Sequence, residues 1–134
     1  MSDDDWFAPF EAVLALPGLR ETTFQTAGSG ASARPFKVAG TEPDALLVKT
    51  SRGGTIALRA EAFAAALKVL SDLAPDDPEG WVLTGDDTLV AVLQSENRDK
   101  ACSSYVLPLL DAAGKVELDR VSRPSRVRLR RQGR

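Results

Sequence analysis

The sequence contains no histidine and only one cysteine, Cys102, in 134 residues. Histidine is the commonest acid or base near neutral pH, and its imidazole is the commonest metal ligand. Its absence excludes serine or cysteine nucleophiles that a histidine activates. One cysteine forms no internal disulfide and supplies too few thiolates for a zinc site. We therefore expect no metal and no cofactor, and we expect Cys102 to be a small buried residue.

Long apolar runs are also missing. No stretch approaches the roughly 20 apolar residues that span a bilayer. The first residues, Met1 to Asp5, are acidic where a secretory signal carries positive charge. These features predict a cytoplasmic protein with no membrane partner. The hydrophobic fraction of 43% is typical of a globular chain, and the length predicts one compact domain or two very small ones that share a core.

Carboxylates and lysine remain as candidates for catalysis. A restriction-type nuclease would need a Pro-Asp pair and a second carboxylate two residues before a lysine, because these groups hold Mg²⁺. Pro43-Asp44 and Lys49 meet part of this pattern, but the position two before Lys49 is Leu47, which cannot ligate a metal. Gly53-Gly54 is too short to form a phosphate-binding loop. The chain is therefore predicted not to be an enzyme.

The net charge of −2 hides a polarised distribution. Residues 1–99 contain 8 Lys/Arg and 16 Asp/Glu, a net charge of −8. Residues 100–134 contain 9 Lys/Arg and 3 Asp/Glu, a net charge of +6. A basic end on an acidic body suggests an oriented anionic partner.

Hydrophobic spacing predicts an α+β half over residues 1–74. A first helix has apolar residues at helical spacing and ends at Pro17-Gly18; these residues are Trp6, Phe10, Val13 and Leu14. The β-prone runs that follow are 22–26, 35–38, 45–49 and 55–58, and the last two flank a turn at 51–54. Residues 60–73 carry one apolar stripe and predict a second helix. This order predicts a small antiparallel sheet with helices on one face.

A polar linker at 75–80 separates this half from residues 81–134. Asp86-Asp87 could cap a helix that ends at Gln94, although residues 88–93 could also form a buried strand. A further helix is expected from Ser103 or Ser104 to Ala113, with Gly114 at its C-terminus, because Pro108 is unfavourable in mid-helix.

Residues 115–131 predict a β-hairpin around the turn 122–125. With Val121 opposite Arg126, the expected register places Leu118 opposite Leu129, and it pairs acids with bases. Asp119 then faces Arg128, and Glu117 faces Arg130. This leaves five arginines without expected partners, namely Arg120, Arg123, Arg126, Arg131 and Arg134.

Two helices followed by a two-stranded hairpin is the element order of a winged-helix module, in which the helix before the wing lies in the major groove. The predicted DNA contacts are Arg120, Arg123, Arg126 and Arg131 with phosphates, and Ser103, Ser104 and Tyr105 in the groove. Two alternatives remain open. The hairpin could be only a solvated, charge-rich element with a frayed basic tail. The serines could only cap their helix, with Tyr105 packed at its edge.

The segments Thr23–Thr26, Pro35–Val38, Val48–Ile56 and Phe63–Leu67 resemble a small module of uncharacterised bacterial proteins linked to DNA restriction or phage defence. Ser95–Asn97 and Ser103–Val106 resemble a segment that follows it, and the likeness covers most of residues 22–113. Leu14–Gly18 with Pro35–Gly40 is similar to the opening of YjbR/MmcQ-type proteins, which have a DNA-binding-like fold. The resemblance implies an association with DNA and supplies no catalytic residues.

These observations predict a non-catalytic protein that binds double-stranded DNA, with an α+β half and a winged-helix-like C-terminal half. The alternative is a protein-interaction adaptor. In that case the hairpin docks on an acidic protein, or the helix with Trp6 and Phe7 mediates a homodimer.

Overall fold

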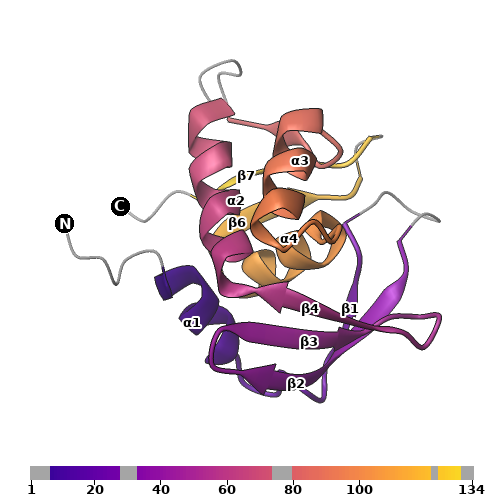
Figure 1. Ribbon diagram of the computed structural model, residues 1–134. Coiled ribbons are helices and arrows are strands. Elements are labelled where there is room, and N and C mark those ends of the chain that lie inside the picture. Colours follow the sequence, from indigo (N-terminus) through magenta and orange to yellow (C-terminus); the bar gives the residue numbers. More distant parts are fainter. Residues whose placement is uncertain (1–6, 28–32, 74–79, 122–123, 131–134) are drawn as a thin grey trace.

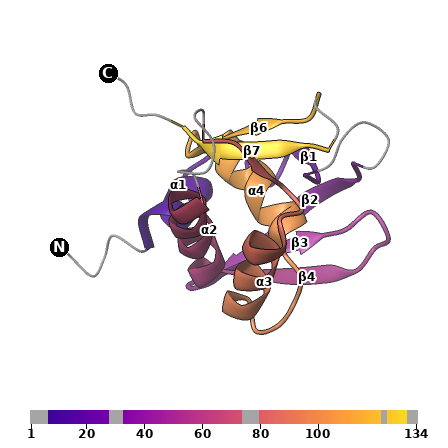
Figure 2. The ribbon, with the colours of Figure 1, turned by 90° about the horizontal axis from the view of Figure 1, so that it is seen from above.

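The computed structural model describes residues 7–27, 33–73, 80–121 and 124–130. Figure 1 shows the elements in order: α1 (Ala8–Leu14), β1 (Thr23–Gln25), β2 (Pro35–Glu42), β3 (Ala45–Lys49), β4 (Thr55–Arg59), α2 (Ala60–Leu73), β5 (Val82–Leu83), α3 (Asp87–Glu96), α4 (Ser103–Ala112), β6 (Val116–Asp119) and β7 (Arg126–Leu129). Seen from above in Figure 2, α2 and α4 lie between one sheet that contains β3 and β4 and another that contains β6 and β7. The predicted α+β class is confirmed.

The first sheet is antiparallel with the order β1-β2-β3-β4. All four predicted strands are present, and the 45–49 and 55–58 runs pair as the expected hairpin. Alternation along β2 buries Phe36 and Val38 and exposes Lys37, so one face of the sheet packs on the core. A register shift between Val38 and Gly40 allows β2 to continue to Glu42, beyond the predicted end at residue 38.

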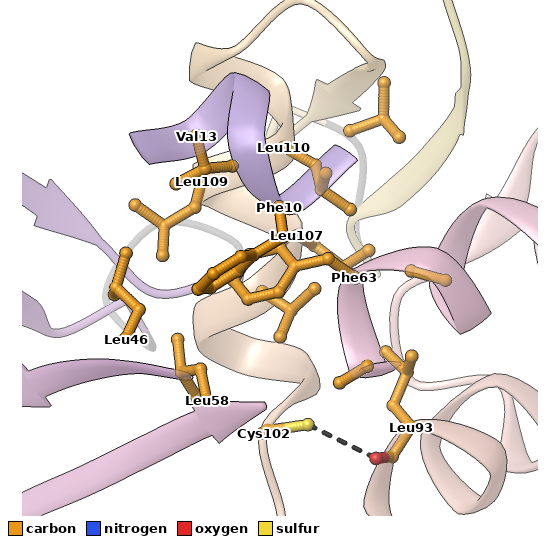
Figure 3. Close-up of a cluster of buried hydrophobic side chains, with 14 of the residues drawn as sticks. Phe10, Val13, Leu46, Leu58, Phe63, Leu93, Cys102, Leu107, Leu109 and Leu110 are labelled. Carbon is orange, nitrogen blue, oxygen red and sulfur yellow. Dashed lines mark hydrogen bonds between the residues drawn. The ribbon is translucent and has the colours of Figure 1, made fainter. Parts of the chain in front are cut away.

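Helices α1 and α2 close the core over this sheet. Helix α2 begins and ends where the apolar stripe predicts, and Phe63, Ala66 and Leu70 on that stripe are fully buried. Figure 3 shows Phe10 of α1 beside Phe63, with ring centroids 5.5 Å apart. Cys102 is buried as expected, and its thiol donates to the Leu93 carbonyl at 3.4 Å.

Helix α3 settles the open choice for residues 88–93 in favour of a helix. The Asp86 carboxylate accepts hydrogen bonds from the backbone N–H groups of Thr88 and Leu89, which satisfies two of the free donors at the helix start. Leu89 and Leu93 are buried beneath it. A local cap therefore decided an element whose apolar pattern was ambiguous.

Helix α4 begins at Ser103 as predicted, and Gly114 follows it with a φ of +78°. Pro108 lies inside this helix and has no N–H to donate to the Ser104 carbonyl, which is four residues earlier. That carbonyl accepts instead from the backbone N–H of Ala27 at 3.0 Å. The proline thus leaves an acceptor that ties α4 to the end of β1.

The second sheet has the order β5-β7-β6, and its hairpin register differs from the prediction. Leu118 faces Val127 rather than Leu129, Asp119 faces Arg126, and Glu117 faces Arg128. The error is a shift of two residues, which keeps every side chain on its predicted face. The expected pairing of Val121 with Arg126 is therefore wrong, and the loop is longer than four residues.

The strand β5 explains this shift. Its residue Val82 pairs with Val127, and both valines are buried. Beyond β5, Thr84 donates its N–H to the Ser125 carbonyl at 3.1 Å, and the two hydroxyls lie 2.7 Å apart. Ser125 is therefore held beside β5 rather than in the turn. A non-local strand fixed the register that hairpin chemistry alone left open.

Buried side chains from both sides of residue 77, such as Phe63 and Leu109, belong to one hydrophobic cluster. The predicted linker at 75–80 lies outside the described residues except for Gly80. Within the described ranges, no helix is long and apolar enough to cross a membrane.

Candidate nucleic-acid interface

The arginines of the C-terminal hairpin are paired with acids. Arg126 Nε lies 2.8 Å from Asp119 Oδ2, and Arg128 Nε lies 3.0 Å from Glu117 Oε1. Both guanidinium groups also lie over the Trp81 ring, 4.4 and 4.3 Å from its centroid. The expectation that Arg126 has no partner is wrong. The two carboxylates therefore neutralise the two guanidinium groups on this face, and the aromatic ring stacks against both.

Of the other predicted phosphate contacts, Arg120 is the one that lies in the described part of the chain. Arg120 donates from Nη2 to the Gln25 carbonyl at 2.6 Å, and its buried Nε has no hydrogen bond within the described residues. Its guanidinium therefore joins the end of β6 to β1. Arg123 and Arg131 lie outside the described residues.

Helix α4 is largely a core element. Residues 106–110 are all buried, and only Ser104 and Ala112 in this helix are exposed. The Tyr105 ring packs edge-on against Phe36 with centroids 5.1 Å apart, and Ser103 is half-buried. This helix exposes too little surface to lie along a major groove. Of the three predicted groove residues, Ser104 is the one that is exposed.

A second group of cations lies on the exposed face of the first sheet. Lys37 of β2 pairs directly with Lys49 of β3, Thr23 of β1 lies beside Lys37, and Thr55 of β4 lies beside Lys49. All four side chains are exposed, and neither lysine forms an ion pair with any described residue. Like charges directly opposite one another on adjacent strands are destabilising. The stability of the fold therefore does not explain why Lys37 and Lys49 are paired.

Two pockets continue from this row. Lys37 and Lys49 line a shallow one of about 230 Å³. It shares Thr50 and Ser51 with a larger pocket of about 460 Å³, to which Arg34 and Arg52 contribute. Ser104 and Tyr105 line the same larger pocket. The structure thus brings two predicted site residues together with arginines from the other half of the chain.

A third pocket of about 470 Å³ lies between the edge of β4 and the α3–α4 loop, and it shares Ile56 and Ala101 with the second. Arg98 and Lys100 line it. The exposed cations of the three pockets are Arg34, Lys37, Lys49, Arg52, Arg98 and Lys100, and we call this set the basic face. No described carboxylate lines any of the three pockets.

Asn97 holds the α3–α4 loop against the sheet. Its Oδ1 accepts from the Arg59 N–H at 2.7 Å, and its Nδ2 donates to the Ala57 carbonyl at 3.1 Å and to the Lys100 carbonyl at 3.2 Å. The amide makes the two bonds that a neighbouring strand would make to the edge of β4. Arg98 and Asp99 follow in left-handed conformations with φ of 56° and 65°. This buried side chain therefore positions the cations on either side of Asp99.

The acids of this sheet lie at its opposite end. Glu42 and Asp44 flank the β2–β3 turn, and Asp44 is paired with Arg59 at 2.8 Å. The register places that turn far along the strands from Lys37 and Lys49. Counting charge along the chain hides this arrangement, because residues 1–99 have a net charge of −8. The separation of the two lysines from the acids becomes visible only in the pairing of β2 with β3.

Two further titratable groups among the described residues have a raised pKa. Burial raises the pKa of the Cys102 thiol to about 12, so it stays protonated. Burial also raises the pKa of Asp111, against the hydrogen bond from the Leu118 N–H and the positive charges of Arg130 and Arg120. In the described part of the chain, no three Cys, Asp or Glu side chains form a group that could hold a metal ion.

No family model, curated protein or solved structure matches this chain. The resemblances to a restriction-associated module and to YjbR/MmcQ-type proteins therefore stay predictions.

Proposed function

We propose that this protein binds DNA through the phosphate backbone, and that the contact surface is the basic face rather than the C-terminal hairpin. The observation that carries the proposal is the direct pairing of Lys37 with Lys49 on an exposed sheet face, beside pockets lined by cations and by no described carboxylate. The protein acts as a binding module without a catalytic step.

Electrostatic effects favour binding at the basic face over binding at the hairpin. A cross-strand lysine pair is unfavourable in the free protein by about 0.2–1 kcal/mol, and a bound polyanion removes that repulsion. Each lysine or arginine that neutralises a phosphate releases condensed counterions, which drives association at low salt. The hairpin arginines already have carboxylate partners, so binding there would first have to break those ion pairs.

The C-terminal half is proposed to be a winged-helix-like module that serves as a scaffold. Two helices, α3 and α4, precede the β6–β7 hairpin, in keeping with that element order. Since α4 packs against the first half, the module would not insert this helix into DNA. Its contribution to binding is the first turn of α4, where Ser104 and Tyr105 line the pocket beside Arg52.

Fluorescence anisotropy of a short labelled duplex at about 50 and 200 mM salt tests the proposal. Replacing both Lys37 and Lys49 with Ala is expected to weaken binding and to reduce the slope of log K against log salt by about 2, because two phosphates lose their partners. Lys68→Ala is the matched control. Lys68 is an exposed lysine on α2 that pairs with Asp72 at 3.4 Å, away from the basic face. Equal affinities for the double variant and the control would refute the proposal.

The alternative is a protein-interaction adaptor, and one observation favours it. Leu83 and Val121 are the two large hydrophobic residues that stand exposed among those described, at 50% and 92%. Leu83 lies in β5, an outer strand of the second sheet. Phe7 packs edge-on against Phe10 at 5.2 Å, while Trp6 lies outside the described residues. Light scattering that gives a stable dimer, disrupted by Leu83→Ser, would support this alternative.

A further inference from the structure

The pocket of about 460 Å³ on the basic face is built from segments that are distant in sequence. The β3–β4 turn contributes Thr50, Ser51 and Arg52, and the start of α4 contributes Ser104 and Tyr105. The turn lies at the right in Figure 1, at the same end of the sheet as the start of β2. Arg34, the residue immediately before β2, also lines the pocket. Because these segments are brought together by the tertiary fold, the pocket is not a feature of one loop.

The β3–β4 turn is held in place by its own backbone. Thr50 donates its N–H to the Gly54 carbonyl at 2.8 Å, and Gly53 donates its N–H to the Thr50 carbonyl at 2.9 Å. The φ of Gly53 is +90°, a conformation that side chains other than hydrogen disfavour. Ser51 and Arg52 are therefore presented by a fixed turn, which lowers the entropy cost of binding a ligand.

The pocket is rich in donors and lacks acids. Five residues with hydroxyls and two arginines line it, and no described carboxylate does; they are Thr26, Thr50, Ser51, Ser104, Tyr105, Arg34 and Arg52. The Arg34 guanidinium donates to the Ala33 carbonyl at 3.2 Å, and the Arg34 backbone N–H donates to the Thr26 hydroxyl at 2.8 Å, which holds this residue beside the pocket. Cys102, the N-cap residue of α4, makes no side-chain capping bond, so the positive end of the helix dipole adds to this field.

We propose that this pocket binds a phosphate monoester, the terminal phosphate of a nucleic acid strand. This inference rests on the proposed function. A backbone phosphodiester carries one negative charge and has two free oxygens. A terminal phosphate carries about two charges and has three oxygens, which match a pocket with this many donors. The pocket shares Thr50 and Ser51 with the Lys37–Lys49 row, where the next phosphates of the strand would lie.

The test compares one duplex in three forms: with 5′-phosphates, with 3′-phosphates and with hydroxyls at every end. Anisotropy competition is expected to show about tenfold tighter binding for one phosphorylated form than for the hydroxyl form. Arg52→Ala is expected to remove this preference, and Arg52→Lys to restore only part of it, because lysine lacks the planar fork. Arg52 is exposed in a turn, so these variants are expected to fold. Lys68→Ala serves as the control that leaves the preference unchanged.

The outcomes separate this inference from the proposed function. Equal affinity for all three duplexes would overturn the terminal-phosphate site and leave DNA binding intact. If no duplex binds, the proposed function fails, and a titration with a nucleoside monophosphate, followed by the amide NMR signals of Ser51, Arg52 and Ser104, decides the pocket. Shifts that disappear in Arg52→Ala would assign it to a free nucleotide, and absence of shifts would overturn it.

Discussion

The C-terminal hairpin and the basic face both carry arginine or lysine on an exposed sheet, but they differ in what lies opposite each cation. On the hairpin, Arg126 and Arg128 face Asp119 and Glu117 across the strands. On the first sheet, Lys37 faces Lys49. A cation opposite an acid is satisfied in the free protein, whereas a cation opposite a cation lacks such a partner, and the proposed function assigns that role to a ligand. The density of positive charge in the sequence is therefore a poorer guide to an anion site than the cross-strand partner.

The largest effect is expected from Asn97, a neutral residue that holds part of the basic face against the sheet. Asn97→Ala leaves the Arg59 N–H and the Ala57 carbonyl without their partner, so the free energy of unfolding should fall by about 2–4 kcal/mol. Urea denaturation measures this change, and Ser95→Ala, an exposed position on α3, is its control. Hydrogen exchange should quicken at Arg59 and Lys100 while the hairpin amides stay protected. A loss of less than about 0.5 kcal/mol would show that Asn97 does not hold the loop.

The hairpin should respond in the opposite way. Arg126→Ala removes the ion pair with Asp119 and the stacking on Trp81, at a cost of about 1–2 kcal/mol in the free energy of unfolding. DNA affinity should not change. Thermal unfolding and anisotropy on the same sample check both halves of this prediction. Arg130→Ala is the milder control, because Arg130 lies 3.9 Å from Asp111. A drop in DNA affinity with Arg126→Ala would return the hairpin to the binding surface.

A substitution in the lysine pair is expected to have a smaller effect on stability, and this effect is a gain. Lys37→Glu places an acid opposite Lys49, so it should raise the free energy of unfolding by about 0.5 kcal/mol while it weakens DNA binding. A variant that is more stable but binds DNA more weakly is expected where residues serve ligand binding at the expense of stability. Denaturation at low salt measures the gain. A destabilised Lys37→Glu variant would mean that the lysines already have compensating contacts.

The smallest effect concerns Asp111, which lies under the hairpin. Burial raises its pKa above 3.8, so the folded protein binds this proton more tightly than the unfolded chain does. Its contribution therefore favours folding below pH 3.8 and is lost as pH rises through the higher, folded-state pKa. The difference in melting temperature between the native chain and Asp111→Asn should shift in favour of Asn across that interval. A difference that is flat with pH would contradict the prediction.

Local signals were enough to predict most of the secondary structure. The stripe in α2, the Asp86 cap of α3 and Gly114 after α4 each act within one or two turns of chain, and each appears where the sequence indicates. The hairpin register was wrong because Val127 is paired on its other side by Val82, a partner 45 positions away. Hairpin turn chemistry holds no information about that strand.

The candidate site was predicted only in part, for a similar reason. Ser104 and Tyr105 were identified, but their neighbours Arg34 and Arg52 come from the first half, through the packing of α4 on β1. The lysine pair depends on a strand register that composition does not report. Arg126 was assigned to DNA because the predicted register gave it no acid partner. Each error follows from contacts between segments that are distant in sequence.

The most direct measurement compares the two regions in one experiment. Salt-dependent DNA affinity would be measured for the native chain, for Lys37→Glu with Lys49→Glu, and for Arg126→Ala with Arg128→Ala. The account predicts that the basic-face variant loses affinity by more than about tenfold, and that the hairpin variant binds as the native chain does. Loss of binding in the hairpin variant with an unaffected basic-face variant would contradict it.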